Sequence, residues 1–202
     1  MESWIRTGQK ISPEKFNHVS DLILNHTVLF IAGEIYRICE IEFYLLSKNH
    51  PDIYTHGHSD QKKYGTWYFH RHTNGTYKAI RRGIDISIGT EDCFCGILIR
   101  SIYGGDKFIE GPELTVRHIL NRYGAEKIVD LIKQDENIGI LDNKFSLIIK
   151  DATGKIESIF VGPRIGLNED KDPIFREKPY RYLIGKDKIK KEKKSLRQLK
   201  TE

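Results

Sequence analysis

Cysteine is scarce in this sequence, with Cys39, Cys93 and Cys95 the only three among 202 residues. An odd count leaves one thiol unpaired, and a bridge between the two cysteines of a Cys-x-Cys segment requires strained geometry. A disulfide framework is therefore not the basis of the fold. We expect reduced, buried thiols and a cytoplasmic protein, or a nuclear one in a eukaryote.

Long apolar runs and linkers are also missing. No stretch approaches the roughly 20 apolar residues that a membrane helix needs, and Met1 to Lys10 lack the basic-then-apolar order of a secretory signal. There is no internal repeat and no Pro/Gly-rich boundary, and a chain of this length can build one well-packed core. We expect a monomer with no membrane partner and a single domain over residues 1–186.

Basic charge is present in excess and is unevenly placed. Lysine and arginine number 33 against 28 acidic residues, a net charge of +5, and many of the lysines lie near the C-terminus. We expect residues 187–202 to form a basic, frayed or weakly helical tail. Its lysines, Lys190 and Lys191 among them, are either simply solvated or attract nucleic-acid phosphates.

Apolar periodicity predicts a sheet with a few helices around it. Helical spacing of apolar residues predicts helices at residues 12–25, 111–120 and 125–134. Alternating or short apolar runs predict strands at residues 27–32, 34–45, 66–71, 76–80, 84–88, 96–102, 145–150, 155–161 and 180–184. Asn74-Gly75 and Thr153-Gly154 are typical hairpin turns. The fold class is α+β, with a curved, partly closed antiparallel sheet and a few flanking helices.

Polar residues interrupt three of the apolar strands. Glu40 and Glu42 lie within residues 34–45, where alternation places them on one face with Tyr44. Such a face is often simply exposed to solvent, because burying unpaired carboxylates is costly. However, Asp85 and Arg100 interrupt two further strands in the same way. Convergence of Glu42, Asp85 and Arg100 on a sheet rich in aromatic residues predicts a pocket for a flat, polar molecule.

The order of these segments resembles the alkyladenine (3-methyladenine) DNA glycosylases. The resemblance rests on colinear short motifs between Val19 and Lys186, which in this chain read RICEIEFY (37–44), DIYTH (52–56), IDIS (84–87), ILIRS (97–101), GPEL (111–114), PRIG (163–166), KPYRY (178–182) and IG (184–185). The motifs span nearly the whole chain. Each motif is short, so their common order carries the resemblance.

The resemblance implies an enzyme of base-excision repair. Such an enzyme flips an alkylated or otherwise modified purine out of DNA and hydrolyses its N-glycosidic bond, with no cofactor and no metal. By motif position, Glu42 matches the carboxylate that activates water, and Arg100 matches the arginine that holds both. Tyr44 and His56 match residues that contact the flipped base, and the backbone at Ile165 matches a segment whose carbonyl binds the water.

Several positions depart from the family pattern. The third pocket aromatic, a tyrosine in the family, falls near Tyr68 or His70, and Asp85 replaces an asparagine. An ionised Asp85 would favour cationic or amino-bearing purines over neutral hypoxanthine. The family's basic Thr-Pro-Arg-Asn segment is absent from residues 58–64. The expected nucleic-acid contacts, to DNA with RNA left open, are Tyr77, Arg164, Lys178, Lys190 and Lys191.

Two other function classes remain open from the sequence. The first is a metal-dependent hydrolase that uses histidine and aspartate ligands, for which the sequence offers His50, Asp52, His56, His58 and Asp60, with His70 and His72 nearby. The second is a glycosylase-like module that holds nucleic acid without cutting it. The substituted Asp85 and the missing basic segment favour this second alternative.

Overall fold

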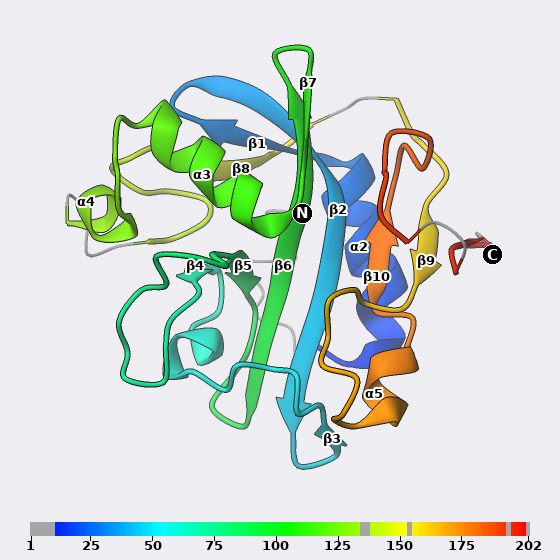
Figure 1. The fold of residues 1–202 in the computed structure, drawn as a ribbon. Coiled ribbons are helices and arrows are strands. Elements are labelled where there is room, and N and C mark those ends of the chain that lie inside the picture. The colour runs from blue at the N-terminus through cyan, green and yellow to red at the C-terminus, as the bar shows by residue number, and fades with distance from the viewer. Residues whose placement is uncertain (1–10, 134–137, 153–154, 193–194, 201–202) are drawn as a thin grey trace.

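A computed structural model describes residues 11–133, 138–152, 155–192 and 195–200. The fold is α+β, with short helices around one antiparallel sheet (Figure 1). The helices are η1 (Pro13–Lys15), α2 (Phe16–Asn25), η2 (Ser59–Lys62), α3 (Pro112–Arg122), α4 (Ile128–Ile132) and α5 (Pro173–Glu177). The strands are β1 (Thr27–Ile31), β2 (Glu34–Ser47), β3 (His50–Pro51), β4 (Thr66–Phe69), β5 (Ile84–Ser87), β6 (Cys93–Gly104), β7 (Lys107–Glu110), β8 (Ile148–Asp151), β9 (Phe160–Gly162), β10 (Arg181–Leu183) and β11 (Arg197–Gln198). The predicted fold class is confirmed, although the sheet is open and not closed.

The sheet has the order β11-β9-β10-β2-β6-β5-β4, with the other strands attached beside this path. The long strands β2 and β6 run side by side through its centre (Figure 1). On one of their faces Ile41 and Phe43 pair with Ile99 and Ile97, and all four side chains are fully buried. Phe16 of α2 stacks on Phe43 at 4.1 Å between ring centroids, which fixes this helix against the core.

The predicted N-terminal helix is confirmed, because Pro13 opens a short 3-10 turn that leads into α2. Its buried residues include Phe16, Val19 and Ile23, at the helical spacing read from the sequence. The helix predicted from Gly111-Pro112 is also present as α3. α3 covers one end of β6, where the Thr115 hydroxyl donates to the backbone carbonyl of Arg100.

The pairing of β2 with β6 contains two compensating irregularities. Cys39 has no partner between the pairs Ile38–Ile102 and Glu40–Ser101, and Arg100 has none before the pair Ile41–Ile99. Because one extra residue on each strand offsets the other, the alternation of faces continues beyond them. The irregularity lies where the side chain of Arg100 meets Glu40 and Glu42.

Three predicted elements are wrong. Residues 76–80 are not a strand. Beyond the turn at Asn74-Gly75 the pairing is limited to a bridge between Arg71 and Tyr77 and the hydrogen bonds from the N–H groups of His72 and Lys78 to the carbonyls of Thr76 and His70. The predicted second hairpin does not form: β8 pairs with β1, whereas β9 pairs with β10 and β11. Its proposed turn, at residues 153–154, lies outside the described residues. The predicted helix at 125–134 is reduced to α4 among the residues described.

The C-terminal segment belongs to the domain, so residue 186 is not a structural boundary. β11 extends the sheet by pairing with β9. Ile189 and Leu196 are buried against Leu183, and the guanidinium of Arg181 donates to the backbone carbonyls of Lys191 and Glu192. The sequence interpretation weighed the lysines and overlooked the apolar residues between them, which supply the packing.

The three cysteines are free and buried, as expected. Burial raises the pKa of the Cys39 thiol to about 12, so this group stays protonated. Among the described helices, none has the length and apolar character needed to cross a bilayer.

Candidate active site

Glu42 is completely buried and accepts hydrogen bonds from three groups. The hydroxyl of Tyr44 donates to Oε2 at 2.8 Å, and Nη1 of Arg100 donates to the same oxygen at 3.2 Å. The backbone N–H of Ile165 donates to Oε1 at 2.9 Å. All three neighbours are donors, which matches the acceptor-only character of a carboxylate.

A second buried carboxylate extends this cluster. Glu40 accepts from Nε of Arg181 at 2.6 Å and from the Ser101 hydroxyl at 2.5 Å, and Nε of Arg100 lies 3.4 Å from its Oε1. Two carboxylates therefore share two guanidinium groups. A buried network of this kind adds little net stability, because desolvation offsets most of the attraction between the charges. A role in a site explains its presence better than a role in stability.

The environment fixes the protonation of two members of the cluster. Burial, followed by the nearby Glu42 carboxylate, raises the pKa of Tyr44 well above its ordinary value, so its hydroxyl keeps the proton that it donates. Burial disfavours the charge on Arg100, but the carboxylates of Glu42 and Glu40 outweigh this effect and raise its pKa. Arg100 is therefore a permanent cation beside Glu42.

A small cavity lies next to this cluster. It has a volume of about 140 Å³ and is lined by Tyr44, Tyr54, His56, Gln61, His70, Asp85 and Leu167. Pockets for drug-sized ligands are larger, roughly 300–1,000 Å³. The cavity therefore suits a single flat ring system better than an extended substrate. Tyr44 lines it and donates to Glu42, so this side chain connects the cavity to the buried carboxylate.

Most of the residues predicted to contact a base meet at this cavity. Tyr44, His56, His70 and Asp85 line it, and the hydroxyl of Tyr68 lies 3.3 Å from Nδ1 of His56. Ile165 contacts Glu42 through its backbone N–H, whereas the sequence interpretation assigned a role to its carbonyl.

The sequence interpretation missed Tyr54, Gln61 and Leu167, which also line the cavity. Tyr54 and Leu167 lie two residues from the predicted His56 and Ile165, so proximity in sequence could have suggested them. Gln61 lies in η2, where no periodic pattern marked it.

Asp85 has a different partner from the one the sequence suggested. The sequence predicted that Arg100 converges with both Glu42 and Asp85, and Arg100 does bind Glu42, but its second carboxylate is Glu40. One oxygen of Asp85 lies 2.7 Å from Nε2 of His70, and the other accepts from the amide of Gln61 at 3.3 Å.

The environment of His56 lowers its pKa to about 4, through desolvation first and the neighbouring His70 second. His56 is thus neutral near pH 7, although part of the residue reaches solvent. A neutral imidazole can donate from one ring nitrogen and accept at the other, as recognition of a polar ring requires.

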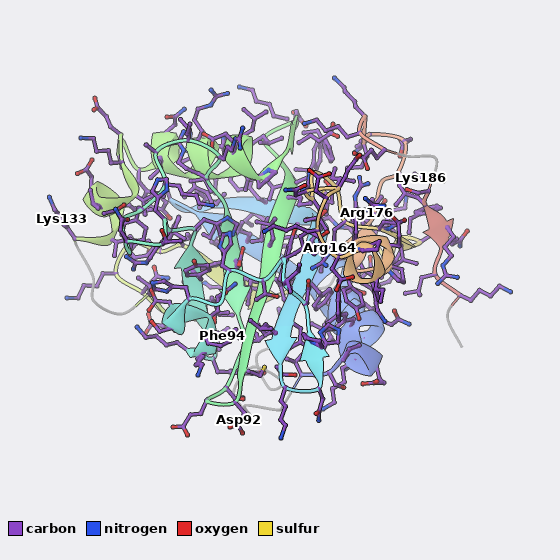
Figure 2. The ribbon with its side chains drawn as sticks, turned by 60° about the horizontal axis from the view of Figure 1, so that its bottom comes forward. Asp92, Phe94, Lys133, Arg164, Arg176 and Lys186 are labelled. Atoms are coloured by element: carbon purple, nitrogen blue, oxygen red, sulfur yellow. The ribbon has the colours of Figure 1, made fainter. Side chains whose placement is uncertain are left out.

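Arg164 is not available to nucleic acid, so this predicted contact is wrong. Its guanidinium forms two hydrogen bonds with Asp52, at 2.6 and 3.1 Å, and neither side chain is exposed. In Figure 2 Arg164 lies within the outline of the molecule, whereas Lys133 projects from its edge. Sequence alone could not distinguish this buried arginine from a surface one.

The loop between β4 and β5 presents a different set of groups from the one predicted. The expected contact Tyr77 is half-buried, with the guanidinium of Arg71 lying 3.9 Å from its ring centroid. Ile80 is 73% exposed in the same loop, followed by Arg81 and Arg82. Arg82 donates to the carboxylate of Glu113 at 2.9 and 2.7 Å. Proteins that kink DNA insert apolar side chains between base steps, so the exposed Ile80 is a candidate for that role.

The other predicted nucleic-acid contacts are accessible to differing degrees. Lys190 and Lys191 are exposed, and Lys178 is half-buried with its ammonium 5.7 Å from the ring centroid of Phe175. These three side chains remain candidates for phosphate contacts.

Two of the residues considered for a metal site are engaged elsewhere. His50 lies between the carbonyl of Leu45 and the hydroxyl of Tyr180, and Asp52 binds Arg164. Within the ranges that the structure describes, no three histidine, cysteine or acidic side chains are grouped to hold an ion. The geometry therefore gives the metal hydrolase alternative no support.

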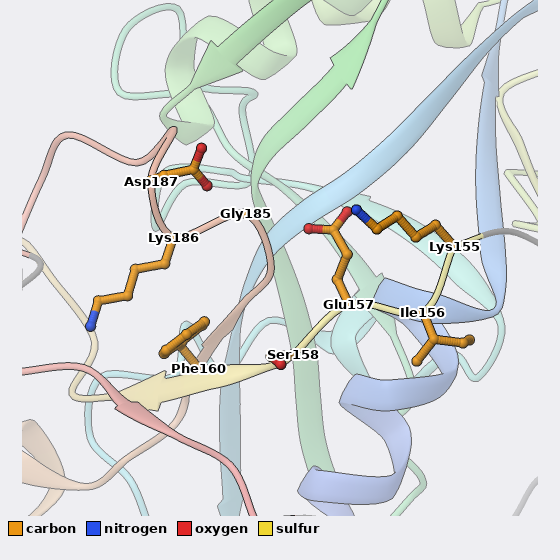
Figure 3. Close-up of a pocket in the computed structure, with 8 residues that line it drawn as sticks. All are labelled: Lys155, Ile156, Glu157, Ser158, Phe160, Gly185, Lys186 and Asp187. Carbon is orange, nitrogen blue, oxygen red and sulfur yellow. The ribbon is translucent and has the colours of Figure 1, made fainter.

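A larger hollow of about 690 Å³ lies near β9 and the segment after β10 (Figure 3). Its charged groups contact neighbouring side chains. Glu157 accepts from Arg37 at 2.6 Å, and the ammonium of Lys186 lies 4.8 Å from the ring centroid of Phe160. This surface lacks a buried ionised group of the kind found at Glu42, so the smaller cavity is the better candidate site.

Comparison with known sequences identifies a related protein, but that relative has no assigned activity. No family model matches the chain. Over 206 aligned residues the chain is 38% identical to uncharacterized protein L759 of Acanthamoeba polyphaga mimivirus, and the alignment covers 94% of each protein. The chain therefore belongs to the same family as this mimivirus protein.

Proposed function

We propose that this protein is an N-glycosylase that hydrolyses the bond between a modified purine and its sugar in nucleic acid, with DNA as the expected substrate. The observation that carries the proposal is the arrangement at Glu42. This fully buried carboxylate is joined through the Tyr44 hydroxyl to a cavity sized for one ring system. The order of motifs in the sequence supports the same activity independently.

The chemistry requires a carboxylate of this kind. Breaking an N-glycosidic bond creates positive charge on the sugar, and a fixed negative charge stabilises that state. Glu42 would also accept a proton from the water that attacks C1′. Arg100 and the N–H of Ile165 hold the carboxylate in place, so little reorganisation is needed during the reaction.

The substrate must be rotated out of the base stack to reach the cavity. A base in a duplex is inaccessible, and unstacking it costs a few kcal/mol. Insertion of Ile80 into the vacated position would offset this cost, and Arg81 beside it would contact the phosphates. In this proposal the loop between β4 and β5 would supply both groups.

The proposal is tested by measuring base release from modified DNA and RNA oligonucleotides, with Glu42→Gln compared with Glu40→Gln. Both glutamates are buried and both lie beside Arg100. Of the two, it is Glu42 that also accepts hydrogen bonds from the Tyr44 hydroxyl and the Ile165 N–H. We expect Glu42→Gln to reduce release at least about 10²-fold, the usual contribution of a general base. Glu40→Gln should retain far more activity at equal folded fraction.

Equal losses in the two variants would contradict the assignment of Glu42 as the base. EDTA is included in a parallel series, and release that depends on a metal ion would contradict the proposed mechanism.

A second candidate function is a module that holds a modified base without cutting it. One observation favours it: both oxygens of Glu42 already accept hydrogen bonds, and Glu42 does not line the cavity. Activation of water would then require one of these contacts to be exchanged. Tight binding of a modified oligonucleotide by the wild-type protein, with no base released, would establish this alternative.

A further inference from the structure

The buried carboxylate of Glu42 is connected to the cavity through the side chain of Tyr44. Glu42 is completely buried and does not line the cavity, whereas Tyr44 lines it and is half-buried. Arg100 and Ile165, which supply the other hydrogen bonds to Glu42, do not line the cavity either. Of the groups that contact Glu42, Tyr44 is therefore the one that a molecule in the cavity can reach.

The hydroxyl of Tyr44 can both give and receive a proton. It donates to Oε2 of Glu42 at 2.8 Å. A phenolic oxygen that donates one hydrogen bond still has lone pairs that accept, so a water molecule in the cavity can donate to the same oxygen. Burial and the neighbouring Glu42 raise the pKa of Tyr44 well above its ordinary value. The hydroxyl therefore keeps its proton near pH 7 until a second proton replaces it.

The contact between Tyr44 and Glu42 is held by the surrounding structure. Both residues lie on β2 two positions apart, so their side chains leave the same face of one strand. The guanidinium of Arg164 lies 4.5 Å from the ring centroid of Tyr44, and two hydrogen bonds to Asp52 fix that guanidinium. A site built on a strand and supported by packed neighbours keeps its geometry better than one on a loop. The short contact is therefore suited to proton transfer.

We propose that Tyr44 is a catalytic residue that passes a proton from the attacking water to Glu42. This inference rests on the proposed glycosylase function. The C1′–N bond breaks and its electron pair stays with the base, so that a cationic base such as 7-methylguanine leaves as a neutral molecule. The water oxygen then bonds to C1′. One water proton moves to the Tyr44 oxygen while the Tyr44 proton moves to Oε2 of Glu42, and return of a proton to solvent along the same path restores both groups.

The relay explains how an enclosed carboxylate with both oxygens occupied can act on water. Direct activation would require Glu42 to exchange its contact with Tyr44, Arg100 or Ile165 for one with water. The relay instead uses the contact with Tyr44 and leaves the other two unchanged. The attacking water then lies on the cavity side of Tyr44, where the sugar of a base bound in the cavity would also lie.

The first test compares base release in a single turnover by Tyr44→Phe and Tyr54→Phe. Both changes remove one hydroxyl and keep the ring, and both tyrosines line the cavity. The Tyr54 hydroxyl, however, donates to the backbone carbonyls of Asn168 and Asp172. We expect Tyr44→Phe to reduce release at least about 10²-fold, the usual contribution of a positioned proton-transfer group, and Tyr54→Phe to reduce it far less at equal folded fraction. Release near the wild-type rate by Tyr44→Phe, or equal losses in the two variants, would overturn the relay.

A second measurement separates a relay from a hydroxyl that only holds Glu42 in place. Two protons move in the relay, whereas direct transfer from water to Glu42 moves one. The rate of release by the wild-type protein is therefore measured in mixtures of H₂O and D₂O, where the relay predicts a curved dependence on the deuterium fraction. A straight or flat dependence would overturn the proposal. This measurement uses no variant, so it does not depend on how well a variant folds.

The relay and the proposed function fail in different ways. If Glu42→Gln is inactive and Tyr44→Phe is active, the glycosylase function stands and the relay is excluded. When the relay operates, adding Tyr44→Phe to Glu42→Gln should cause little further loss, because residues that act as a unit have non-additive effects. Losses that multiply in the double variant would contradict the relay. If the wild-type protein releases no base from any oligonucleotide of the panel, the proposed function itself fails.

Discussion

Asp52 and Arg164 form a bidentate ion pair in which both side chains are fully buried. The same guanidinium donates to the backbone carbonyl of Phe43 and lies 4.5 Å from the ring centroid of Tyr44. The residue after Arg164 is Ile165, whose N–H holds Glu42. This ion pair therefore positions two of the groups that contact Glu42, although it does not touch the cavity itself.

We predict that Asp52→Asn destabilises the protein strongly. The change leaves the Arg164 charge buried without its ionic partner, and loss of one member of a buried pair costs about 3–5 kcal/mol. The free energy of unfolding from urea denaturation measures the effect. The control is Glu177→Gln, which removes a carboxylate from the far more exposed pair with Arg176 and should change stability by at most about 1 kcal/mol. Similar effects of the two substitutions would contradict the structural role of Asp52.

We predict that Ile80→Ser weakens opening of the duplex and leaves the fold unchanged. Ile80 is 73% exposed, so its loss removes little packing within the protein. A wedge acts only when a base must be unstacked, so release from duplex substrate should fall several-fold more than release from single strands. The exposed Ile174, in α5, is the matched control for loss of a surface apolar side chain. A variant that acts equally on both substrates would exclude the wedge role.

The C-terminal segment leads to two separate predictions, one for stability and one for phosphate binding. Deletion after Lys186 should lower the free energy of unfolding, because it removes β11 and the buried side chains of Ile189 and Leu196. Each such aliphatic side chain contributes about 1.5–3 kcal/mol when fully buried. A truncated protein as stable as the full chain would contradict this packing.

The double change Lys190→Ala with Lys191→Ala should leave stability unchanged, because both side chains are exposed. If these lysines bind phosphates, the slope of log K against log salt should fall by about 1 for each phosphate that is no longer neutralised. An unchanged slope would assign the lysines to solvation alone.

The lowered pKa of His56 predicts that the folded protein loses stability in mild acid. Its pKa is about 4 in the folded protein, against about 6.5 for an unperturbed histidine. As pH falls, the imidazole is therefore protonated in the unfolded chain before it is protonated in the folded protein. The stability that depends on a neutral His56 is fully present above about pH 6.5 and is lost as pH falls toward 4. Because part of the residue is exposed, we expect at most about 1 kcal/mol.

The measurement is the difference between the wild-type protein and His56→Asn in denaturant unfolding at several pH values. The wild-type protein should lose more stability than the variant between pH 6.5 and 4. The exposed His72 provides the control substitution. A constant difference between wild type and His56→Asn across this range would contradict the assignment.

The sequence by itself determined the elements whose patterns are local. The apolar spacing of Phe16, Val19 and Ile23 identified the N-terminal helix, because residues on one helical face recur every three to four positions. Alternation identified β2, β5 and β6, and the polar interruptions at Glu42, Asp85 and Arg100 marked the face that carries the site. Side chains on a strand alternate strictly, so one residue indicates the orientation of the rest.

Only the tertiary structure decided how the charged groups pair. Arg100 binds Glu42, as the motif resemblance implied, but its second carboxylate is Glu40 and not Asp85. Arg164 and the C-terminal segment looked like surface features, since charge in a sequence does not reveal its partner. In the folded protein Arg164 is buried by its ion pair with Asp52, and the C-terminal segment is anchored by the buried side chain of Ile189. Pairing over long sequence separations depends on three-dimensional packing, which local patterns do not encode.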